Sequence, residues 1–197
     1  MEWAKELYGS YAKEAMGTRM SYSLTGKLAS AGEMSWFIAK TRYFRQEIKM
    51  RDELGQRGVD AFVPTVNVRK SRGKGTYEKV LAPNILFVRA SKTDACLLVT
   101  RDLLPIQFVP DCATRQMMVV PDKQMEDFRR VFDLSLGEGG LVDETLELGE
   151  KVRVTKGALR GVEGYVVELL GRTYVVVSLI GCLWARARVP RAWLEKI

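Results

Sequence analysis

The chain has 197 residues, 47% of them hydrophobic, and carries 31 Lys and Arg residues against 24 Asp and Glu residues. This composition is typical of one or two small globular domains with a basic tilt. The absence of histidine excludes Ser-His-Asp and Cys-His catalysis and zinc sites with imidazole ligands. The three cysteines are far apart, so neither a disulfide framework nor a thiolate metal site is expected.

The positive charge is concentrated in one part of the chain. Residues 35–136 hold 18 basic and 12 acidic residues, whereas residues 137–197 hold nine and eight. A basic excess confined to one domain suits a surface that binds a polyanion, although many basic domains simply carry a solvated positive face. Neither a run of about 20 apolar residues nor a signal-peptide pattern is present. We therefore expect a cytoplasmic protein that contacts no membrane.

The first two thirds of the chain predict a mixture of strands and helices. Residues 1–34 have weak periodicity and are interpreted as an extension or leader, partly disordered. The hydrophobic pattern then predicts, in chain order, a strand over 36–39, a helix over 43–57, strands over 59–68, 76–80 and 85–88, and helices over 94–100 and 122–132. This order predicts an α+β domain over residues 35–133, with an antiparallel or mixed sheet.

The last third predicts a linker and a second, all-β domain. Residues 134–146 combine glycines with acidic residues and have no apolar period, which is typical of a linker. Residues 147–197 hold several short β-branched runs separated by recurring glycines. Such closely spaced strands predict a small closed β-barrel of the SH3-like kind, because closure removes exposed strand edges.

The start of this second domain carries a recognisable motif. Residues 149–167 resemble the KOW motif of transcription elongation factors and several ribosomal proteins, with Gly157 and Gly161 suited to a tight reversal and Gly164 to close approach of two strands. A phosphate-binding loop is a rival interpretation of residues 157–164. No Gly-Lys-Ser/Thr sequence follows the loop, however, and no helix is predicted after it.

The resemblance extends to the first domain. Residues 36–88 look like the N-terminal (NGN) domain of NusG-family factors: an aromatic first strand, a basic segment before the first helix, Phe-Val-Pro-Thr at 62–65, a basic hairpin, and Leu-Ala-Pro-Asn-Ile-Leu-Phe-Val at 81–88. Together with residues 104–108 and 120–126, the segment from Pro83 to Phe87 looks closest to the UpxY-like branch. Members of that branch act as antiterminators on capsular polysaccharide operons.

The resemblance implies a transcription elongation and antitermination factor rather than an enzyme. Such a protein needs no cofactor or metal, and we expect it to be a monomer. It binds the RNA polymerase clamp and the facing lobe, and so suppresses pausing or termination. The candidate polymerase-binding residues, which are apolar or rigid residues at strand ends and loops, are Phe62, Pro64, Pro83, Asn84, Ile85 and Phe108.

The resemblance also implies contact with non-template DNA or nascent RNA. Basic side chains would contact phosphates and bases, and an aromatic ring before the first helix could stack on an unpaired base. Solvated surface charge is the alternative for each cation. The candidate nucleic-acid-binding residues are Lys40, Arg42, Tyr43, Arg45, Lys49, Arg69, Lys70, Arg72 and Lys74.

The sequence departs from the general family pattern at two places. General NusG factors carry an aromatic residue in the loop at 178–182, where it helps to dock the termination factor Rho or a ribosomal protein. Ile180 stands in its place, next to Gly181, and Cys182 replaces a basic residue. The changes at Ile180 and Cys182 put in doubt the contacts that Ile180 and Gly181 would make with Rho and the ribosome. Ile85 likewise stands where tyrosine is common.

Two other classes of function remain open. The first is a KOW-type RNA-binding or ribosome-associated protein. The second is a magnesium-dependent enzyme acting on a phosphoester through Asp94, Asp102 and Asp122. These three acids follow no metal-ligand spacing and lie beside helix starts, where helix capping explains them.

Overall fold

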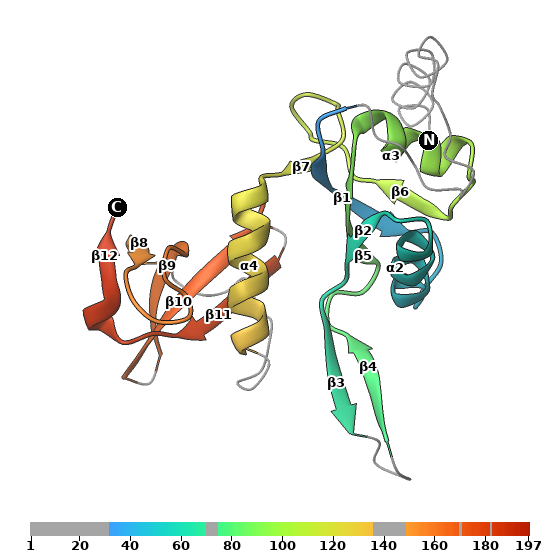
Figure 1. Cartoon of the computed structure of the whole chain (residues 1–197). Coiled ribbons are helices and arrows are strands. Elements are labelled where there is room, and N and C mark those ends of the chain that lie inside the picture. Colours follow the sequence, from blue (N-terminus) through green and yellow to red (C-terminus); the bar gives the residue numbers. More distant parts are fainter. Residues whose placement is uncertain (1–31, 70–74, 136–148, 170, 182) are drawn as a thin grey trace. The chain divides into compact units, whose positions relative to one another are not determined.

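The computed structural model describes residues 32–69, 75–135, 149–169, 171–181 and 183–197, coloured by sequence in Figure 1. Packing divides the chain into two compact units, residues 1–120 and 121–197. The sequence analysis expected the boundary after residue 133. In the structure it lies after residue 120, and the helix that follows groups with the C-terminal unit. The predicted extension, up to residue 31, and nearly all of the predicted linker lie outside the described residues.

The N-terminal unit is built on an antiparallel sheet with strand order β2-β5-β1-β6. Its strands are β1 (Ser35–Thr41), β2 (Asp60–Phe62), β5 (Ile85–Ala90) and β6 (Ile106–Phe108), and β7 (Val119–Val120) also pairs with β1. The central pair aligns Phe37 with Val88 and Lys40 with Ile85. The aromatic and β-branched residues of β1 and β5 favour this central position, because their side chains pack well on a pleated, buried surface.

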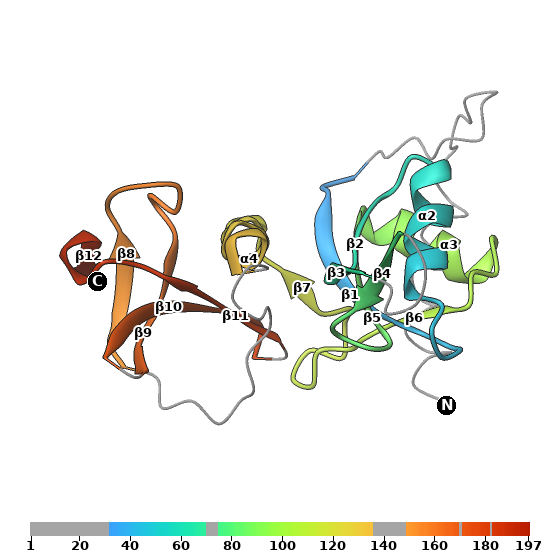
Figure 2. The ribbon, with the colours of Figure 1, turned by 90° about the horizontal axis from the view of Figure 1, so that it is seen from below.

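Two helices cover one face of this sheet: α2 (Glu47–Gln56) and α3 (Lys92–Thr100), as Figures 1 and 2 show. Met50 and Leu54 of α2 and Leu98 of α3 are buried in the same cluster as Phe37 and Val88 of the sheet. The side-chain oxygen of Ser91 caps α3 by accepting a hydrogen bond from the amide of Asp94, at 3.0 Å. The core therefore lies between the sheet and the two helices.

The strands and helices predicted in the first domain are present, with three differences. Helix α2 begins at Glu47 rather than at residue 43. The predicted strand over 59–68 is two strands, β2 and β3 (Thr65–Arg69), interrupted at Pro64, and β3 forms a hairpin with β4 (Thr76–Val80). Strands β6 and β7 were not predicted, because runs of two or three residues are too short to show alternation.

The C-terminal unit combines one helix with a five-stranded antiparallel sheet in the order β11-β10-β9-β8-β12 (Figure 2). Helix α4 (Asp122–Ser135) precedes the strands, and a short 3-10 helix, η1 (Arg191–Trp193), precedes the last one. The strands are β8 (Lys151–Val154), β9 (Glu163–Leu169), β10 (Arg172–Leu179), β11 (Leu183–Arg188) and β12 (Leu194–Lys196). The predicted second domain is thus a β-structure, and the closure of its barrel stays a prediction.

Glycines shape the start of this sheet as the sequence indicated. Gly157 has φ of 77°, and a Cβ atom there would lie 2.5 Å from the Trp193 ring. A Cβ at Gly164 would lie 2.5 Å from the carbonyl oxygen of Val176. Only glycine lets β9 approach β10 this closely.

None of the described helices is both long and apolar enough to cross a membrane.

Candidate functional site

The turn between β4 and β5 explains the Pro-Asn pair at 83–84. The amide of Ile85 donates to the carbonyl oxygen of Ala82 at 3.4 Å, and Asn84 has φ of 62°. With proline, whose φ is fixed near −65°, as the first central residue, this is the arrangement of a type II turn, which favours Gly or Asn as the second. Pro83 is exposed, while Asn84 and Ile85 are half-buried.

The candidate polymerase-binding residues do not all reach the surface. Pro83, Asn84 and Ile85 lie together in the turn, whereas Pro64 is buried. Phe62 is half-buried, with its ring centroid 6.2 Å from that of Phe87.

Phe108 has no exposed surface. Its ring packs edge-on against Phe37 at 5.9 Å within the core. We therefore correct the candidate set by removing Phe108, because a fully buried ring cannot contact a partner without unfolding of the sheet.

Residues 42–46 form an exposed loop between β1 and α2. Its two aromatic side chains are among the most exposed apolar groups described, with 56% of Tyr43 and 66% of Phe44 accessible. Arg45 has φ of 60°, a left-handed conformation that a residue with a side chain adopts only at a cost. Its guanidinium carbon lies 5.5 Å from the centre of the Phe44 ring. The loop therefore displays apolar rings together with positive charge.

Among the residues that the structure describes, the cations in and beside this loop have no acidic partner. Lys40, Arg42, Arg45 and Lys49 are exposed, and none forms an ion pair with a carboxylate in the part of the chain that the structure describes. Arg69 is exposed at the end of β3, and Lys70, Arg72 and Lys74 lie outside the described residues. The predicted cations Lys40, Arg42, Arg45 and Lys49 thus lie exposed in and beside one loop.

Two exposed apolar residues lie in or near this loop: Phe44, which with Tyr43 was a candidate for stacking on a base, and Leu103, which the sequence analysis missed. Phe44 was interpreted as part of the first helix, because it fits the helical spacing of Ile48. Leu103 is 76% exposed with φ of 52°, and no sequence signal distinguishes it from the buried Leu104 beside it. The amide of Arg42 donates to the carbonyl oxygen of Pro105 at 2.8 Å, which joins the Leu103 segment to the start of the loop.

In the C-terminal unit, the loop between β10 and β11 holds the other predicted contact residues. Ile180 and Gly181 both have left-handed backbones, with φ of 46° and 68°. For a β-branched residue this conformation is a genuine outlier that the surrounding structure must enforce. Ile180 is half-buried and Gly181 exposed, and the amide of Gly181 donates to the Ser178 hydroxyl at 2.9 Å.

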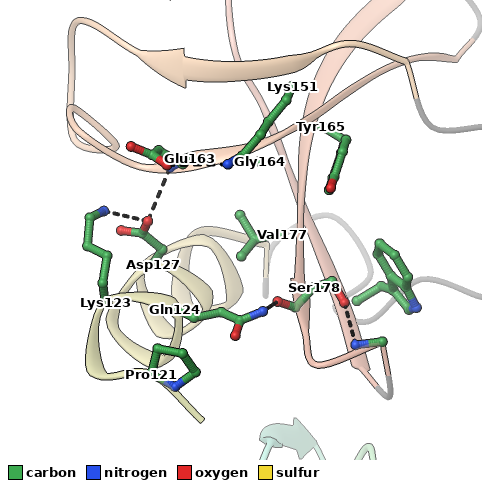
Figure 3. A pocket seen from close by; sticks show the side chains of 12 residues that line it. Pro121, Lys123, Gln124, Asp127, Lys151, Glu163, Gly164, Tyr165, Val177 and Ser178 are labelled. Carbon is green, nitrogen blue, oxygen red and sulfur yellow. Dashed lines mark hydrogen bonds and ion pairs between the residues drawn. The ribbon is translucent and has the colours of Figure 1, made fainter. Parts of the chain in front are cut away.

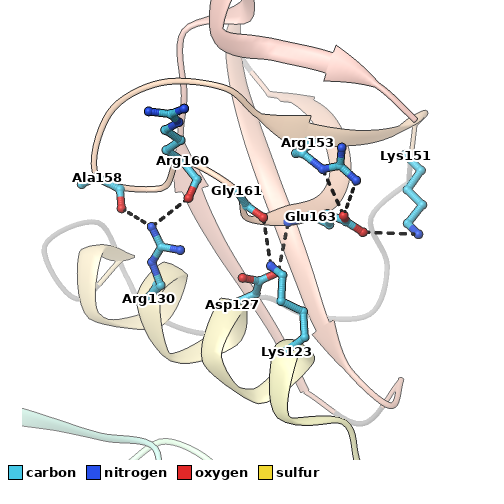
Figure 4. Close-up of polar contacts among 9 residues, drawn as sticks. All are labelled: Lys123, Asp127, Arg130, Lys151, Arg153, Ala158, Arg160, Gly161 and Glu163. Atoms are coloured by element: carbon cyan, nitrogen blue, oxygen red, sulfur yellow. Dashed lines mark hydrogen bonds and ion pairs between the residues drawn. The ribbon is translucent and has the colours of Figure 1, made fainter.

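The polar side of α4 is bonded to the main chain of the C-terminal sheet and its loops (Figure 4). Lys123 donates to the carbonyl oxygen of Gly161 at 2.9 Å, and Asp127 accepts from the amide of Glu163 at 3.1 Å. Arg130 donates to the carbonyl oxygens of Ala158 and Arg160, at 2.6 and 3.1 Å. These contacts explain why α4 groups with the C-terminal unit.

A cavity of about 500 Å³ lies between α4 and this sheet (Figure 3). Its wall includes Lys123 and Asp127 from α4, and Lys151, Glu163 and Tyr165 from the strands. Gln124 closes one side by donating to the carbonyl oxygen of Ser178 at 2.6 Å. Because charges of both signs line the cavity, it shows no preference for a ligand of either sign.

The acids proposed for magnesium chemistry have structural partners. Asp94 accepts from the Ser91 hydroxyl at 2.7 Å in the cap of α3. The Arg101 guanidinium bonds to Asp102 and lowers the pKa of that carboxyl, and Asp122 begins α4. No group of three or more His, Cys, Asp or Glu side chains within the described ranges is arranged to hold a metal ion.

Three comparisons connect the chain to known proteins. The family model "Transcription termination factor nusG" matches residues 34–129. The transcription termination/antitermination protein NusG of several Streptococcus pyogenes serotypes is 28% identical over 150 residues, covering 70% of this chain and 82% of the relative. A solved structure titled "Domain interaction in Thermotoga maritima NusG" aligns with 84% of this chain and 98% of its own, at 19% identity and a TM-score of 0.44. The N-terminal unit is thus similar to the NusG family model, and the chain is similar to curated NusG transcription termination/antitermination proteins.

Proposed function

We propose that this protein is a transcription antitermination factor that binds RNA polymerase through the turn Ala82–Ile85 and unpaired nucleic acid through the loop 42–46. The observation that carries this proposal is the loop itself. It presents two exposed aromatic rings, and the four cations in and beside it, Lys40, Arg42, Arg45 and Lys49, have no carboxylate partner in the described structure. Proteins usually bind single-stranded nucleic acid with aromatic rings that stack on the bases and with cations that contact the phosphates.

The polymerase contact rests on the turn. Pro83 is exposed and conformationally rigid, and Asn84 is held by hydrogen bonds on both sides, so a partner would meet a preformed surface and lose little entropy on binding. Clamp and facing lobe of the polymerase are the partners that family resemblance suggests. The motif from Pro83 to Phe87 supports the narrower proposal of an UpxY-like factor acting on capsular polysaccharide operons.

The test uses the full chain and elongation complexes assembled on a scaffold with an open non-template strand. We expect the protein to bind the complex and to increase read-through of a terminator. Pro83→Glu should abolish both effects, because a charge on the turn is desolvated against the polymerase. Pro190→Glu places the same charge on an exposed proline of the C-terminal unit and serves as the matched control.

The outcome separates this proposal from a KOW-type RNA-binding or ribosome-associated protein. Stoichiometric sedimentation with ribosomes, together with no binding to core polymerase, would favour that alternative. The operon proposal is tested separately in cells that lack the protein. Transcripts from the distal genes of polysaccharide operons should fall relative to the promoter-proximal genes, and unchanged ratios would contradict it.

A further inference from the structure

The exposed loop 42–46 is fastened at both ends to the same residue. Thr41, which precedes the loop, donates from its amide to the carbonyl oxygen of Asn84 at 3.2 Å. Glu47, which follows the loop, accepts from the amide of Asn84 through its side-chain oxygen Oε1 at 2.5 Å. A weaker contact of 3.4 Å joins the Thr41 hydroxyl to the side-chain oxygen of Asn84. The single residue Asn84 therefore closes the base of the loop.

The burial of Glu47 requires an explanation. Only 2% of this residue is exposed, and a buried carboxylate is costly unless hydrogen bonds replace its water. Glu47 is the first residue of α2, where the helix dipole favours a negative charge. A solvated carboxylate would profit from the dipole as well, so the dipole does not account for the burial. The main-chain amide of Asn84 accounts for the burial of the Glu47 carboxylate, because it donates a hydrogen bond to that carboxylate inside the protein.

Asn84 can serve this purpose because of its backbone conformation. With φ of 62°, it is the second central residue of the turn Ala82–Ile85. Its amide is directed to α2 and its carbonyl oxygen accepts from β1. The turn proposed to meet the polymerase and the loop proposed to meet nucleic acid therefore share one set of hydrogen bonds, made by Thr41, Asn84 and Glu47.

We propose that Glu47 is a positioning residue for nucleic-acid binding: through the amide of Asn84 it holds the loop 42–46 in the conformation that presents its cations and rings, and it ties that loop to the turn Ala82–Ile85. This inference rests on the proposed function, since it names how the same surface is kept in order. Glu47 itself touches neither partner. Any ligand that orders the turn also favours the bound conformation of the loop, and the effect is reciprocal.

The inference is tested with Glu47→Ala, Glu47→Gln and Glu53→Ala in the full chain. Glu47→Ala removes the acceptor, whereas Glu47→Gln keeps a carbonyl oxygen in its place and removes only the charge. Glu53→Ala removes a carboxylate from the same helix, one that pairs with Arg57 at 2.7 Å on the partly exposed side. Glu53→Ala is therefore the control for the loss of an ion pair and a charge, because Glu53 forms no hydrogen bond with the loop in the described structure.

Two measurements are made: backbone order of residues 42–46 by NMR relaxation, and affinity for an unstructured single-stranded oligonucleotide as a function of salt. Glu47→Ala should lower the order of the loop and weaken binding about tenfold, the cost of fixing roughly one backbone residue. The salt slope should stay unchanged because the cations remain. Glu47→Gln should keep the order of the loop and bind within about twofold of the parent, and Glu53→Ala should match the parent in both measurements.

Distinct results would overturn the positioning role and the proposed function. If the loop keeps its order and affinity in Glu47→Ala, or if Glu53→Ala loses as much, Glu47 is only a structural residue. If the unchanged protein binds no nucleic acid, the proposed function fails, and the relaxation data still decide whether Glu47 orders the loop. Should Glu47→Ala not fold, Glu47→Asp replaces it, because the shorter side chain withdraws the acceptor while retaining the charge. The same two readouts then apply.

Discussion

The cations of the loop surface (Lys40, Arg42, Arg45 and Lys49) differ in their partners from three cations of the C-terminal sheet, Lys151, Arg153 and Lys196. In the C-terminal sheet, Arg153 and Lys151 both pair with Glu163, at 2.7 and 3.8 Å, and Lys196 pairs with Glu150. Hydrogen bonding to Arg153 lowers the pKa of Glu163. The loop surface has no such carboxylates among the described residues.

From this difference we expect the availability of a cation to matter more for binding than its presence. A paired cation must give up its carboxylate before it can contact a phosphate, and the gain in binding is offset by that loss. An unpaired, exposed cation gives up only water and counterions. The two surfaces should therefore respond differently when the same number of charges is removed.

The largest expected effect comes from removing three cations of the loop surface: Lys40, Arg42 and Arg45, each changed to Ala. Each phosphate contact on a single strand contributes a salt slope of about 0.7, or about fivefold in affinity at 0.1 M salt. Binding to an open-strand scaffold should fall about 100-fold at 0.1 M salt, and the slope should fall by about 2. Fluorescence anisotropy over a range of salt concentrations measures both quantities.

The matched control removes three paired cations of the C-terminal unit: Lys151, Arg153 and Arg191, whose partners are Glu163 and Glu168. The net charge changes by the same amount, so any effect of overall charge is equal in the two variants. Affinity and slope should remain near those of the parent protein. Equal losses in both variants would show that binding follows net charge and that the loop surface has no special part in it.

A second expected effect concerns how α4 is attached to the C-terminal sheet. Asp127 is 3% exposed and accepts from the Lys123 ammonium at 2.5 Å and from the amide of Glu163. Asp127→Ala should lower the free energy of unfolding by about 2 kcal/mol, because it leaves a main-chain donor without its charged acceptor. Urea denaturation measures this loss.

Glu126 is the natural control for that substitution, since it is exposed on the neighbouring position of the same helix. Glu126→Ala should change stability by less than about 0.5 kcal/mol. Amide exchange would locate the effect of Asp127→Ala in α4 and in the segment 158–163. If the loss is spread instead over the N-terminal unit, α4 is not fastened to the sheet through this carboxylate.

A smaller effect distinguishes the two cysteines whose surroundings are described. Cys96 is fully buried in α3, and burial raises the pKa of its thiol to about 12, whereas Cys112 is exposed in a loop. Because only the thiolate reacts with alkylating reagents, Cys112 should be modified at neutral pH and Cys96 only after unfolding. Mass spectrometry after brief alkylation, in a Cys182→Ser background, measures this order. Early modification of Cys96 would show that α3 opens readily.

The longer strands and the helices of the N-terminal unit could be predicted because their apolar patterns extend over several residues, whereas the short β6 and β7 could not. The start of α2 could not. Tyr43 and Phe44 fit helical spacing, and the left-handed backbone of Arg45, which ends that possibility, leaves no trace in a sequence that contains no glycine there. At the start of the loop, the amide of Arg42 donates to the carbonyl oxygen of Pro105, and these two residues are far apart in the chain.

The candidate site was predicted in part for the same reasons. Pro83 and Asn84 could be recognised as turn residues, because the turn type demands both. Phe108 could not be separated from exposed aromatic residues, because a strand of three residues does not reveal which of its faces is buried. The amphipathic pattern of α4 predicted a buried face but not where its polar side binds, since its partners there are mainly main-chain atoms of distant residues.

The smallest expected effect comes from Arg51, which lies two residues beyond Lys49 on α2 and contrasts with it. Its guanidinium binds both oxygens of Glu78 in β4, at 2.7 and 3.0 Å, and Thr65 donates to the same carboxylate at 2.7 Å. Arg51 is therefore a paired cation within the N-terminal unit. Arg51→Ala should leave the salt slope of nucleic-acid binding unchanged while lowering stability by about 0.5 kcal/mol, the size expected for a partly exposed ion pair.

The stability loss should depend on pH in a defined direction. The Arg51 hydrogen bond, followed by that of Thr65, lowers the pKa of Glu78 below its ordinary value. The pair therefore stabilises the fold fully above the unfolded pKa of about 4.3, and this stabilisation disappears as the pH falls through the lower folded value. The parent and Arg51→Ala should thus differ in unfolding free energy at neutral pH and converge as the pH falls below the lowered pKa of Glu78. A salt slope reduced in Arg51→Ala would instead show that a paired cation still reaches a phosphate, and would remove the distinction between the two kinds of surface.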